Sequence, residues 1–431
     1  MQMFKKPSVI TIFIIGLITV VISSNLNWPA KFSNGIIESD AKGYYAWLPA
    51  IFIYQDLSFS FKEEVEEKYP HGAIPYEYRI LSNGKVSNKY YAGTAFLIAP
   101  FFAIANFITI LFTDLPADGY SYWYPVLVNI ASIFYLLAGL IFIRKLLLNF
   151  KFNEGLISWV LLAVFFATNL FYYTIVEPGM SHIYSFFCIS AFLYYLNKWA
   201  IFVNPKQLAL VSLFLGIIII IRPINGLIIF IAPFFFNGFN EFTGKVAIIF
   251  KSRNTKLMIG SLVLLVSIIS FQPTLYFIQT GSFFLYSYGD ETFQFRAFHL
   301  FDFLFSFKKG AFLYHPILLI SLLGLLYLWR ENRYKATYLL LFLISIFYIF
   351  SCWWSWWYGG SFGQRVLVEF LPLFALLLAY LLSIKRNLWV KISIVLCMLL
   401  CQIQTYQYRY FIIHWEDMNK EKYWEVFLKL K

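Results

Sequence analysis

Two acidic residues follow the first apolar run of the chain. The run at 8–24 leads into Glu38-Ser39-Asp40 and then into an aromatic stretch that includes Tyr44 and Tyr45. Carboxylates two residues apart, held at a membrane surface by aromatic side chains, can act as a general base or bind a divalent cation. An ordinary hydrated loop would have the same composition, and the residue types alone favour neither interpretation.

Three further groups of residues could complete such a site. Glu177 and His182 lie in a short connection between two apolar runs, although Pro178-Gly179 could simply be a turn with His182 capping the next helix. Arg222 precedes Pro223 at a predicted turn, where it could face a phosphate or only extend toward the membrane surface. A long connection at 280–311 contains Arg296 and residues of both charge signs. Long connections of this kind are often functional.

The most unusual stretch begins with four tryptophans in five residues, at 353–357, and continues to Gln364 and Arg365. Tryptophan is common at membrane interfaces, which explains some of these residues. A membrane interface does not explain the Gly-Gly-Ser-Phe-Gly-Gln-Arg sequence that follows. We expect Trp357 to stack on a sugar ring, Gln364 to contact a substrate and Arg365 to neutralise a phosphate.

Long apolar helices must position these residues. Of the 431 residues, 60% are hydrophobic and only 13% are charged, against about 25% charged residues in a soluble domain. Repeated apolar runs approach the ~20 residues that cross a bilayer, and a helix satisfies its own backbone hydrogen bonds there. The sequence predicts an all-α polytopic membrane protein with about 11 transmembrane helices, in a range of roughly 10 to 13. The predicted spans are 8–24, 122–143, 156–173, 180–197, 207–221, 223–236, 257–279, 312–329, 336–351, 366–383 and 388–405.

Basic connections between these runs predict the orientation. Positively charged loops face the cytoplasm, which places the candidate site on the other side. The five basic connections carry Arg144/Lys145/Lys151, Lys198/Lys206, Lys245/Lys251/Arg253/Lys256, Arg330/Arg333/Lys335 and Lys385/Arg386/Lys391.

We treat 1–431 as one integral membrane domain with an uncleaved first helix. The predicted outer parts are a helical first loop at 25–121, the loops at 280–311 and 352–365, and an amphipathic tail at 406–431. The apolar segment 93–112 cannot span if the N-terminus and all five basic loops are inside. Because Pro100 should divide it, we expect it to be re-entrant or interfacial.

Composition also limits the partners. The net charge of +12 arises from short basic loops between apolar runs, so we expect membrane lipids as partners and no nucleic acid. The four cysteines form no CxxC pattern, which argues against zinc and structural disulfides.

The acids after the first run and the Glu177/His182 connection together resemble the family-C glycosyltransferase superfamily, whose polytopic members use polyprenyl-phosphate-linked sugars. The superfamily includes protein O-mannosyltransferases and lipid A aminoarabinose transferases. The resemblance covers the layout of the N-terminal two thirds, and its motifs are short. We expect no counterpart of the large soluble C-terminal domain of some relatives, and the usual pair of adjacent acids is here Glu38-Ser39-Asp40.

The resemblance implies a membrane glycosyltransferase of the cell inner (cytoplasmic) membrane, with its active site on the extracytoplasmic face. It would transfer a sugar from a polyprenyl-phosphate donor to a lipid, glycan or protein acceptor. Asp40 would be the general base with Glu38 as a supporting acid, and Arg222, Arg296 and Arg365 would be candidates for the lipid phosphate. No cofactor is expected and a divalent cation is not expected to be required.

Two alternatives stay open. One is a transporter or flippase of lipid-linked sugars, and the other is a polysaccharide polymerase or ligase. Transporters tend to have repeated halves and ionisable groups at the bilayer midplane, whereas the acids here gather at one face.

Overall fold

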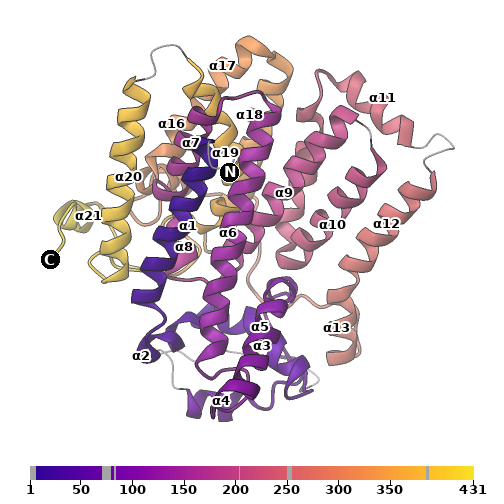
Figure 1. The fold of residues 1–431 in the computed structure, drawn as a ribbon, viewed down its shortest axis with the longest axis vertical. Helices are drawn as coiled ribbons and strands as arrows, with labels where there is room; N and C mark the ends of the chain where they lie inside the picture. Colours follow the sequence, from indigo (N-terminus) through magenta and orange to yellow (C-terminus); the bar gives the residue numbers. More distant parts are fainter. Residues whose placement is uncertain (1–5, 70–78, 82–83, 203, 250–254, 385–387) are drawn as a thin grey trace.

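The computed structural model describes residues 6–69, 79–81, 84–202, 204–249, 255–384 and 388–431 (Figure 1). The chain is 72% helical, with one small antiparallel hairpin of β1 (Arg79–Ile80) and β2 (Val86–Ser87). The predicted all-α class is therefore confirmed. The basic residues Lys251, Arg253, Lys385 and Arg386 lie outside the described residues.

The N-terminal half supplies the first loop and the helices behind it. Its helices are α1 (Pro7–Leu26), α2 (Ala30–Ser33), η2 (Asn34–Ile36, a 3-10 helix), α3 (Asp40–Phe52), α4 (Lys62–Lys68), α5 (Gly93–Phe112), α6 (Trp123–Asn149), α7 (Glu154–Phe166), α8 (Leu170–Ile175), α9 (Ser181–Phe202) and α10 (Pro205–Ile221).

The C-terminal half contains more short helices. They are η3 (Pro223–Phe235, a 3-10 helix), α11 (Phe239–Ile249), α12 (Thr255–Ile269), α13 (Phe271–Thr280), α14 (Leu300–Phe305), α15 (Ala311–Tyr314), α16 (Pro316–Leu322), α17 (Gly324–Glu331), α18 (Arg333–Ser351), η4 (Arg365–Phe370, a 3-10 helix), α19 (Leu371–Leu382), α20 (Leu388–Arg409) and α21 (Lys420–Val426).

Seven of the described helices are long and apolar enough to cross a membrane, or eight if η3 and α11, bent by 105°, form one span. Part of the difference from the predicted 11 has a local cause, since two of the apolar runs are broken. The run 156–173 is divided into α7 and α8, and 312–329 is divided into α15, α16 and α17. The expected break at Arg222-Pro223 is present, because α10 ends at Ile221 and η3 begins at Pro223.

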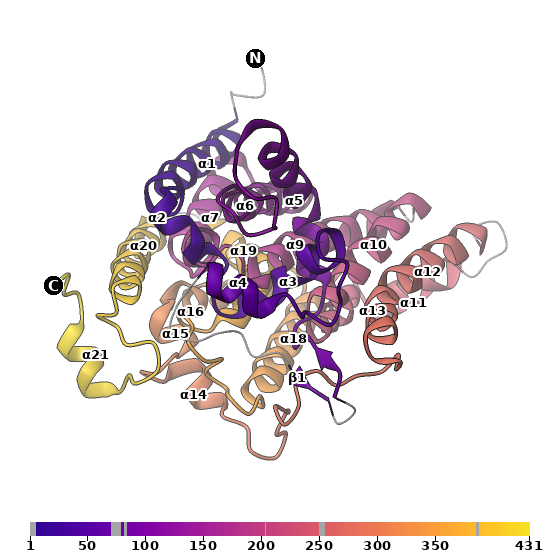
Figure 2. The same ribbon diagram turned by 90° about the horizontal axis from the view of Figure 1, so that it is seen from below.

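The long helices pack side by side, and the first-loop elements lie at one end. Helices α1, α6, α9, α10 and α12 contact one another in that order. Figure 1 shows α2, α3 and α4 below them, and Figure 2 looks onto that end. The segment η4–α19 is almost entirely buried among α7, α9, α16 and α17, so it is the central helix of the molecule.

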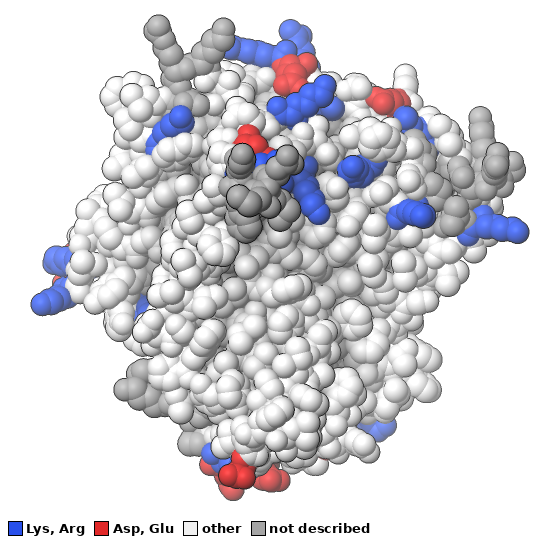
Figure 3. Space-filling view, viewed as in Figure 1, with Lys and Arg blue, Asp and Glu red and all other residues white. Residues whose placement is uncertain are grey.

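The outer surface of the helices is apolar. Exposed side chains include Phe13 on α1, Phe112 on α5, Val263 on α12 and Leu396 on α20. Figure 3 shows a broad central area without charge, with most of the visible Lys and Arg at the upper end. Large exposed apolar surfaces of this kind are suited to lipid contact, which supports a multi-pass membrane protein.

Helix α5 passes through Pro100 without the expected division. It is continuous from Gly93 to Phe112 and is among the helices long enough to span. The ring of Pro100 removes one backbone donor without ending the helix, as membrane helices often tolerate. The re-entrant or interfacial placement of 93–112 stays a prediction.

The start of α5 touches the end of α10 through a glycine. A Cβ atom on Gly93 would lie 2.4 Å from the backbone of Ile220, two residues before Arg222. We therefore expect Gly93→Ala to force the two helices apart, to lower the Tm and to cost about 1–3 kcal/mol. Gly260→Ala on α12, where a Cβ would meet nothing within 4 Å, is the control and should not lower the Tm. Equal Tm values for the two variants would contradict the close approach.

Candidate active site

Asp40 is the first residue of α3, a helix that the protein holds on both sides. Gly43 accepts a hydrogen bond from the Asn88 side chain (2.7 Å), and Trp47 Nε1 donates to the Tyr90 carbonyl (2.9 Å). Tyr45 Oη donates to the carbonyl of Gly119 (2.5 Å). Nearly all of α3 is buried, so the carboxylate of Asp40 has a fixed position.

The turn that follows α8 packs against the start of α3. A Cβ on Gly179 would lie 2.6 Å from the Cβ of Ala41, so only glycine permits this approach. The close contact brings α9 beside α3, where Ser181 Oγ donates to Tyr44 Oη (3.2 Å). His182, one residue later, is buried at the same level.

Arg222 owes its position to the break after α10. Its backbone is extended between α10 and η3, and its Nη1 lies 3.0 Å from Oε1 of the fully buried Glu369. His182 Nδ1 lies 3.1 Å from the same oxygen. Glu369 thus joins a residue from each of two other elements.

The tryptophan-rich loop places Arg365 at the start of the central helix. Hydrogen bonds from Gln294 N to Cys352 O (2.6 Å) and from Trp354 N to Thr292 O (3.0 Å) join it to the 280–311 loop. Deeper in the protein, Asn169 Nδ2 donates to the Phe362 carbonyl (3.1 Å). The loop is therefore anchored at both levels before the chain enters η4.

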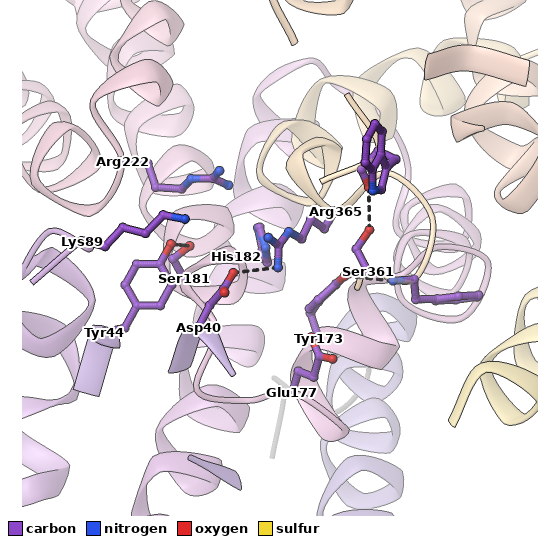
Figure 4. Close-up of polar contacts among 12 residues, drawn as sticks. Asp40, Tyr44, Lys89, Tyr173, Glu177, Ser181, His182, Arg222, Ser361 and Arg365 are labelled. Atoms are coloured by element: carbon purple, nitrogen blue, oxygen red, sulfur yellow. Dashed lines mark hydrogen bonds and ion pairs between the residues drawn. The ribbon is translucent and has the colours of Figure 1, made fainter. Parts of the chain in front are cut away.

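Asp40 and Arg365 form an ion pair. Arg365 Nη1 lies 2.9 Å from Asp40 Oδ2, and Figure 4 shows the two side chains pointing toward each other with Arg222 nearby. The candidate base and a candidate phosphate ligand, from opposite ends of the sequence, thus meet in one place. The residue types and their spacing in the sequence did not predict the contact between Asp40 and Arg365.

These groups line a cavity of about 370 Å³, within the range of small-molecule sites. Its lining residues are mostly charged or aromatic: Ser39, Asp40, Tyr44, Lys89, Tyr90, His182, Arg222, Tyr288, Glu291, Trp353, Trp354, Ser355, Trp357, Tyr358, Gly359, Gly360, Arg365 and Glu416. Trp357 Nε1 donates to Glu416 at the rim (3.2 Å), and Lys308 Nζ lies 3.7 Å from the centroid of the Trp357 ring. The tail therefore takes part in the site through Glu416.

A smaller, mainly apolar groove of about 150 Å³ adjoins the cavity. Arg222, Tyr288, Trp353 and Tyr358 line both. The rest of the groove comes from Tyr91, Pro223, Ile224, Tyr286, Phe293 and Phe350. A polar cavity with an apolar extension suits a ligand that has a polar head and a hydrocarbon tail.

The structure separates the sequence-predicted residues into two sets. Asp40, Tyr44, His182, Arg222, Trp357 and Arg365 line the cavity. The remaining candidates, Glu38, Tyr45, Glu177, Arg296 and Gln364, are not among its lining residues.

Each residue of the second set has its own surroundings. Glu38 lies 3.8 Å from Lys42, and Tyr45 is held by Gly119. Gln364 Nε2 donates to the Trp356 carbonyl (3.3 Å) inside the loop. Arg296 is exposed on the 280–311 loop. The contacts of Glu38, Tyr45 and Gln364 suit support of the surrounding loops.

Sequence reasoning missed several lining or supporting residues. Lys89, paired with Glu291 at 2.6 Å, and Tyr90 come from the first loop, and Glu416 comes from the tail. Of these residues, only Glu369 could have been predicted from the sequence, because an ionisable residue inside an apolar run is costly unless it is paired or functional. The others depend on contacts between distant segments.

The charge of Asp40 is stabilised by its neighbours. Burial opposes ionisation, but the Arg365 guanidinium, a hydrogen bond with Tyr90 and the charge of Lys89 outweigh it. The pKa of Asp40 is therefore below its usual value. The carboxylate is ionised at neutral pH, and it becomes more basic if Arg365 turns to another anion.

The pKa of Glu177 is shifted in the opposite direction from that of Asp40. Its Oε1 accepts a hydrogen bond from Tyr172 Oη (3.0 Å), while its Oε2 is buried without a partner among the described residues. Burial raises the pKa of Glu177 to about 7, although Arg365 and the Tyr172 hydroxyl lower it. Below that pH the side chain carries a proton beside the cavity residues.

The raised pKa of Glu177 predicts a pH-dependent stability. Between the ordinary pKa and about 7 the folded state binds more protons than the unfolded state, so the free energy of unfolding falls as the pH rises. Removing this charge with Glu177→Gln should stabilise the protein at pH 8 by up to roughly 3 kcal/mol and change little at pH 4. Tm measurements at both pH values check this, with the exposed Glu63→Gln as the control. A Tm difference that does not depend on pH would contradict it.

Metal ligands do not cluster in the described part of the chain, where no group of three or more His, Cys, Asp or Glu could hold an ion. The expectation that a divalent cation is not required stays a prediction.

Comparisons with protein-family models, curated proteins and solved structures found no match for this chain.

Proposed function

We propose that this protein is a membrane glycosyltransferase that uses a polyprenyl-phosphate-linked sugar. The observation that carries the proposal is the Asp40–Arg365 ion pair inside a cavity that opens onto an apolar groove. The ion pair provides a proton acceptor and a phosphate ligand side by side. The apolar groove is suited to the first part of a lipid chain.

The donor phosphate would lie between two arginines. Arg222 lines both cavity and groove, and Arg365 lines the cavity. A guanidinium matches the geometry of phosphate oxygens and keeps its charge throughout the reaction. Arg222 is already held in place by Glu369 at 3.0 Å, so little reorganisation would be needed on binding.

The sugar would lie against the aromatic part of the cavity. Tyr90, Tyr288, Trp353 and Trp357 line it, and the Tyr44 and Tyr90 ring centroids are 4.3 Å apart. Flat apolar faces with polar edges suit a pyranose ring, which presents C–H groups on its faces and hydroxyls at its rim.

The proposed step breaks the bond between the anomeric carbon and the phosphate oxygen and forms a bond to the acceptor oxygen. Asp40 accepts the proton of the acceptor hydroxyl as that bond forms. The leaving phosphate takes up the electron pair and is stabilised by Arg222 and Arg365. As Arg365 turns toward the phosphate, its hold on Asp40 weakens and the carboxylate becomes a stronger base.

The predicted threading supports a cavity on the extracytoplasmic face. The predicted cytoplasmic connections are basic, and Figure 3 shows Lys and Arg gathered at one end of the molecule. Most of the cavity lining comes from the first loop and the two late outer loops, which are at the opposite ends of the helices.

The test is sugar transfer by the full chain purified and reconstituted in liposomes. Radiolabelled polyprenyl-phosphate sugars are supplied with a membrane fraction as the source of acceptor. Labelled product separable from the donor would support the proposal. Movement of intact donor across the bilayer without product would favour a flippase instead, and chain extension of a glycan would favour a polymerase.

A further inference from the structure

We propose that a second cavity, at the other end of the central helix from the candidate active site, binds the headgroup of an anionic phospholipid. The cavity has a volume of about 510 Å³. It is lined by Lys151, Phe152, Asn153, Gly155, Leu156, Trp159, Leu382, Ser383, Ile384 and Lys391. This inference is independent of the proposed sugar transfer.

The location of the cavity follows from the helices that form it. The segment η4–α19 begins at Arg365 in the candidate active site and ends at Leu382 beside this cavity. Helix α7 runs between the same two regions, beginning at Glu154 here and leading through α8 to Glu177. The second cavity therefore lies at the basic end of the molecule, where the positive-inside rule predicts the cytoplasmic leaflet and its anionic lipids.

The charge of the lining is positive. Among the described residues that line it, Lys151 and Lys391 are ionisable and none is acidic. The nearest acid along the chain, Glu154, is engaged by Arg144 (2.5 Å), and its other carboxylate oxygen accepts a hydrogen bond from Ser8. The two lysines are therefore available for a negative ligand from outside the chain.

The apolar part of the lining favours a lipid over a free anion. Leu156, Leu382 and Ile384 are apolar, and Trp159 is half-buried with Lys391 Nζ 5.7 Å from its ring centroid. Tryptophan is enriched at the level where headgroups meet acyl chains, and a lysine beside it there can reach a lipid phosphate. Two cations beside apolar side chains match a phosphate and the glycerol ester groups next to it.

The experiment measures lipid binding to the full chain in detergent by native mass spectrometry. Phosphatidylglycerol is compared with phosphatidylcholine of the same acyl chains, and inorganic phosphate is added as a competitor. We expect stronger binding of phosphatidylglycerol and, in Lys151→Gln/Lys391→Gln, a loss of roughly tenfold to thirtyfold. The control Lys206→Gln/Lys256→Gln neutralises two exposed lysines of other basic connections and should bind as the wild type does.

Three results would overturn the inference. Equal binding of both lipids would remove the anionic selectivity, and equal loss in the control variant would show that only overall charge matters. Displacement of the lipid by phosphate at comparable concentration would identify a free-anion site. Sugar transfer does not enter these readouts, so failure here and failure of the proposed function are distinguishable.

Discussion

Asp40→Asn is expected to reduce sugar transfer by about 100- to 10,000-fold, the range that general base catalysis contributes. The amide has nearly the shape of the carboxylate but cannot accept the proton of the acceptor hydroxyl. Its oxygen can still accept a hydrogen bond from Arg365, which lies 2.9 Å from the carboxylate. Transfer by reconstituted protein at saturating donor and acceptor concentrations measures this effect.

Donor binding distinguishes a lost base from a damaged fold. Because the carboxylate of Asp40 competes with the donor phosphate for Arg365, Asp40→Asn should bind donor as tightly as the wild type or more tightly. The matched control is Asp118→Asn, which also loses a charge paired with a cation, Lys68 at 2.7 Å, but does not line the cavity. It should retain transfer. Full activity in Asp40→Asn would remove Asp40 from the mechanism.

The sequence was sufficient to predict the class of the fold but not the number of its long helices. Hydropathy records which segments avoid water, and it does not record where a buried helix ends. Asn169 illustrates the difficulty, since it lies in a predicted span yet separates α7 from α8. Its side chain donates to carbonyl groups of Phe362 and Gln364, so its polarity is satisfied by a distant loop that no local pattern reveals.

The candidate site was partly accessible from the sequence for a related reason. Residues near the ends of apolar runs, such as Asp40, Arg222 and Arg365, were predicted because charged groups there have few roles. The pairing of Asp40 with Arg365 could not be predicted, since it joins the start of α3 to the start of η4, which are more than 300 residues apart in the sequence. Lys89 and Glu416 were missed because their loops have ordinary polar compositions.

The role of Glu369 could have been predicted from the sequence. It is the acid of the apolar run 366–383, and the structure pairs it with both Arg222 and His182. The fully buried carboxylate of Glu369 holds the Arg222 guanidinium at the junction of cavity and groove. Its contribution to the site is to position Arg222, which could have been inferred from the cost of a charge in a membrane helix.

Arg365→Ala is expected to lower kcat/KM for the donor by about 100- to 1000-fold, as for other losses of a fixed donor to a developing charge. Arg365 is committed to Asp40 through Nη1, while its Nε is buried without a hydrogen-bond partner among the described residues. A phosphate oxygen would satisfy that donor. Kinetics with varied donor and fixed acceptor measure the loss, which should be larger for donor use than for acceptor use.

Three comparisons test this assignment. Arg296→Ala removes the same side chain from an exposed loop position and should leave donor kinetics near those of the wild type. Arg365→Lys keeps the charge but not the forked geometry, so it should recover only part of the activity.

In Arg365→Ala the burial of Asp40 is no longer offset by its main counter-charge, so the pKa of that carboxyl should rise. Since the base must be ionised, the acid limb of the pH–rate profile should move to higher pH. An unchanged profile, or equal losses toward donor and acceptor, would mean that Arg365 supports the fold and not the transferred phosphate.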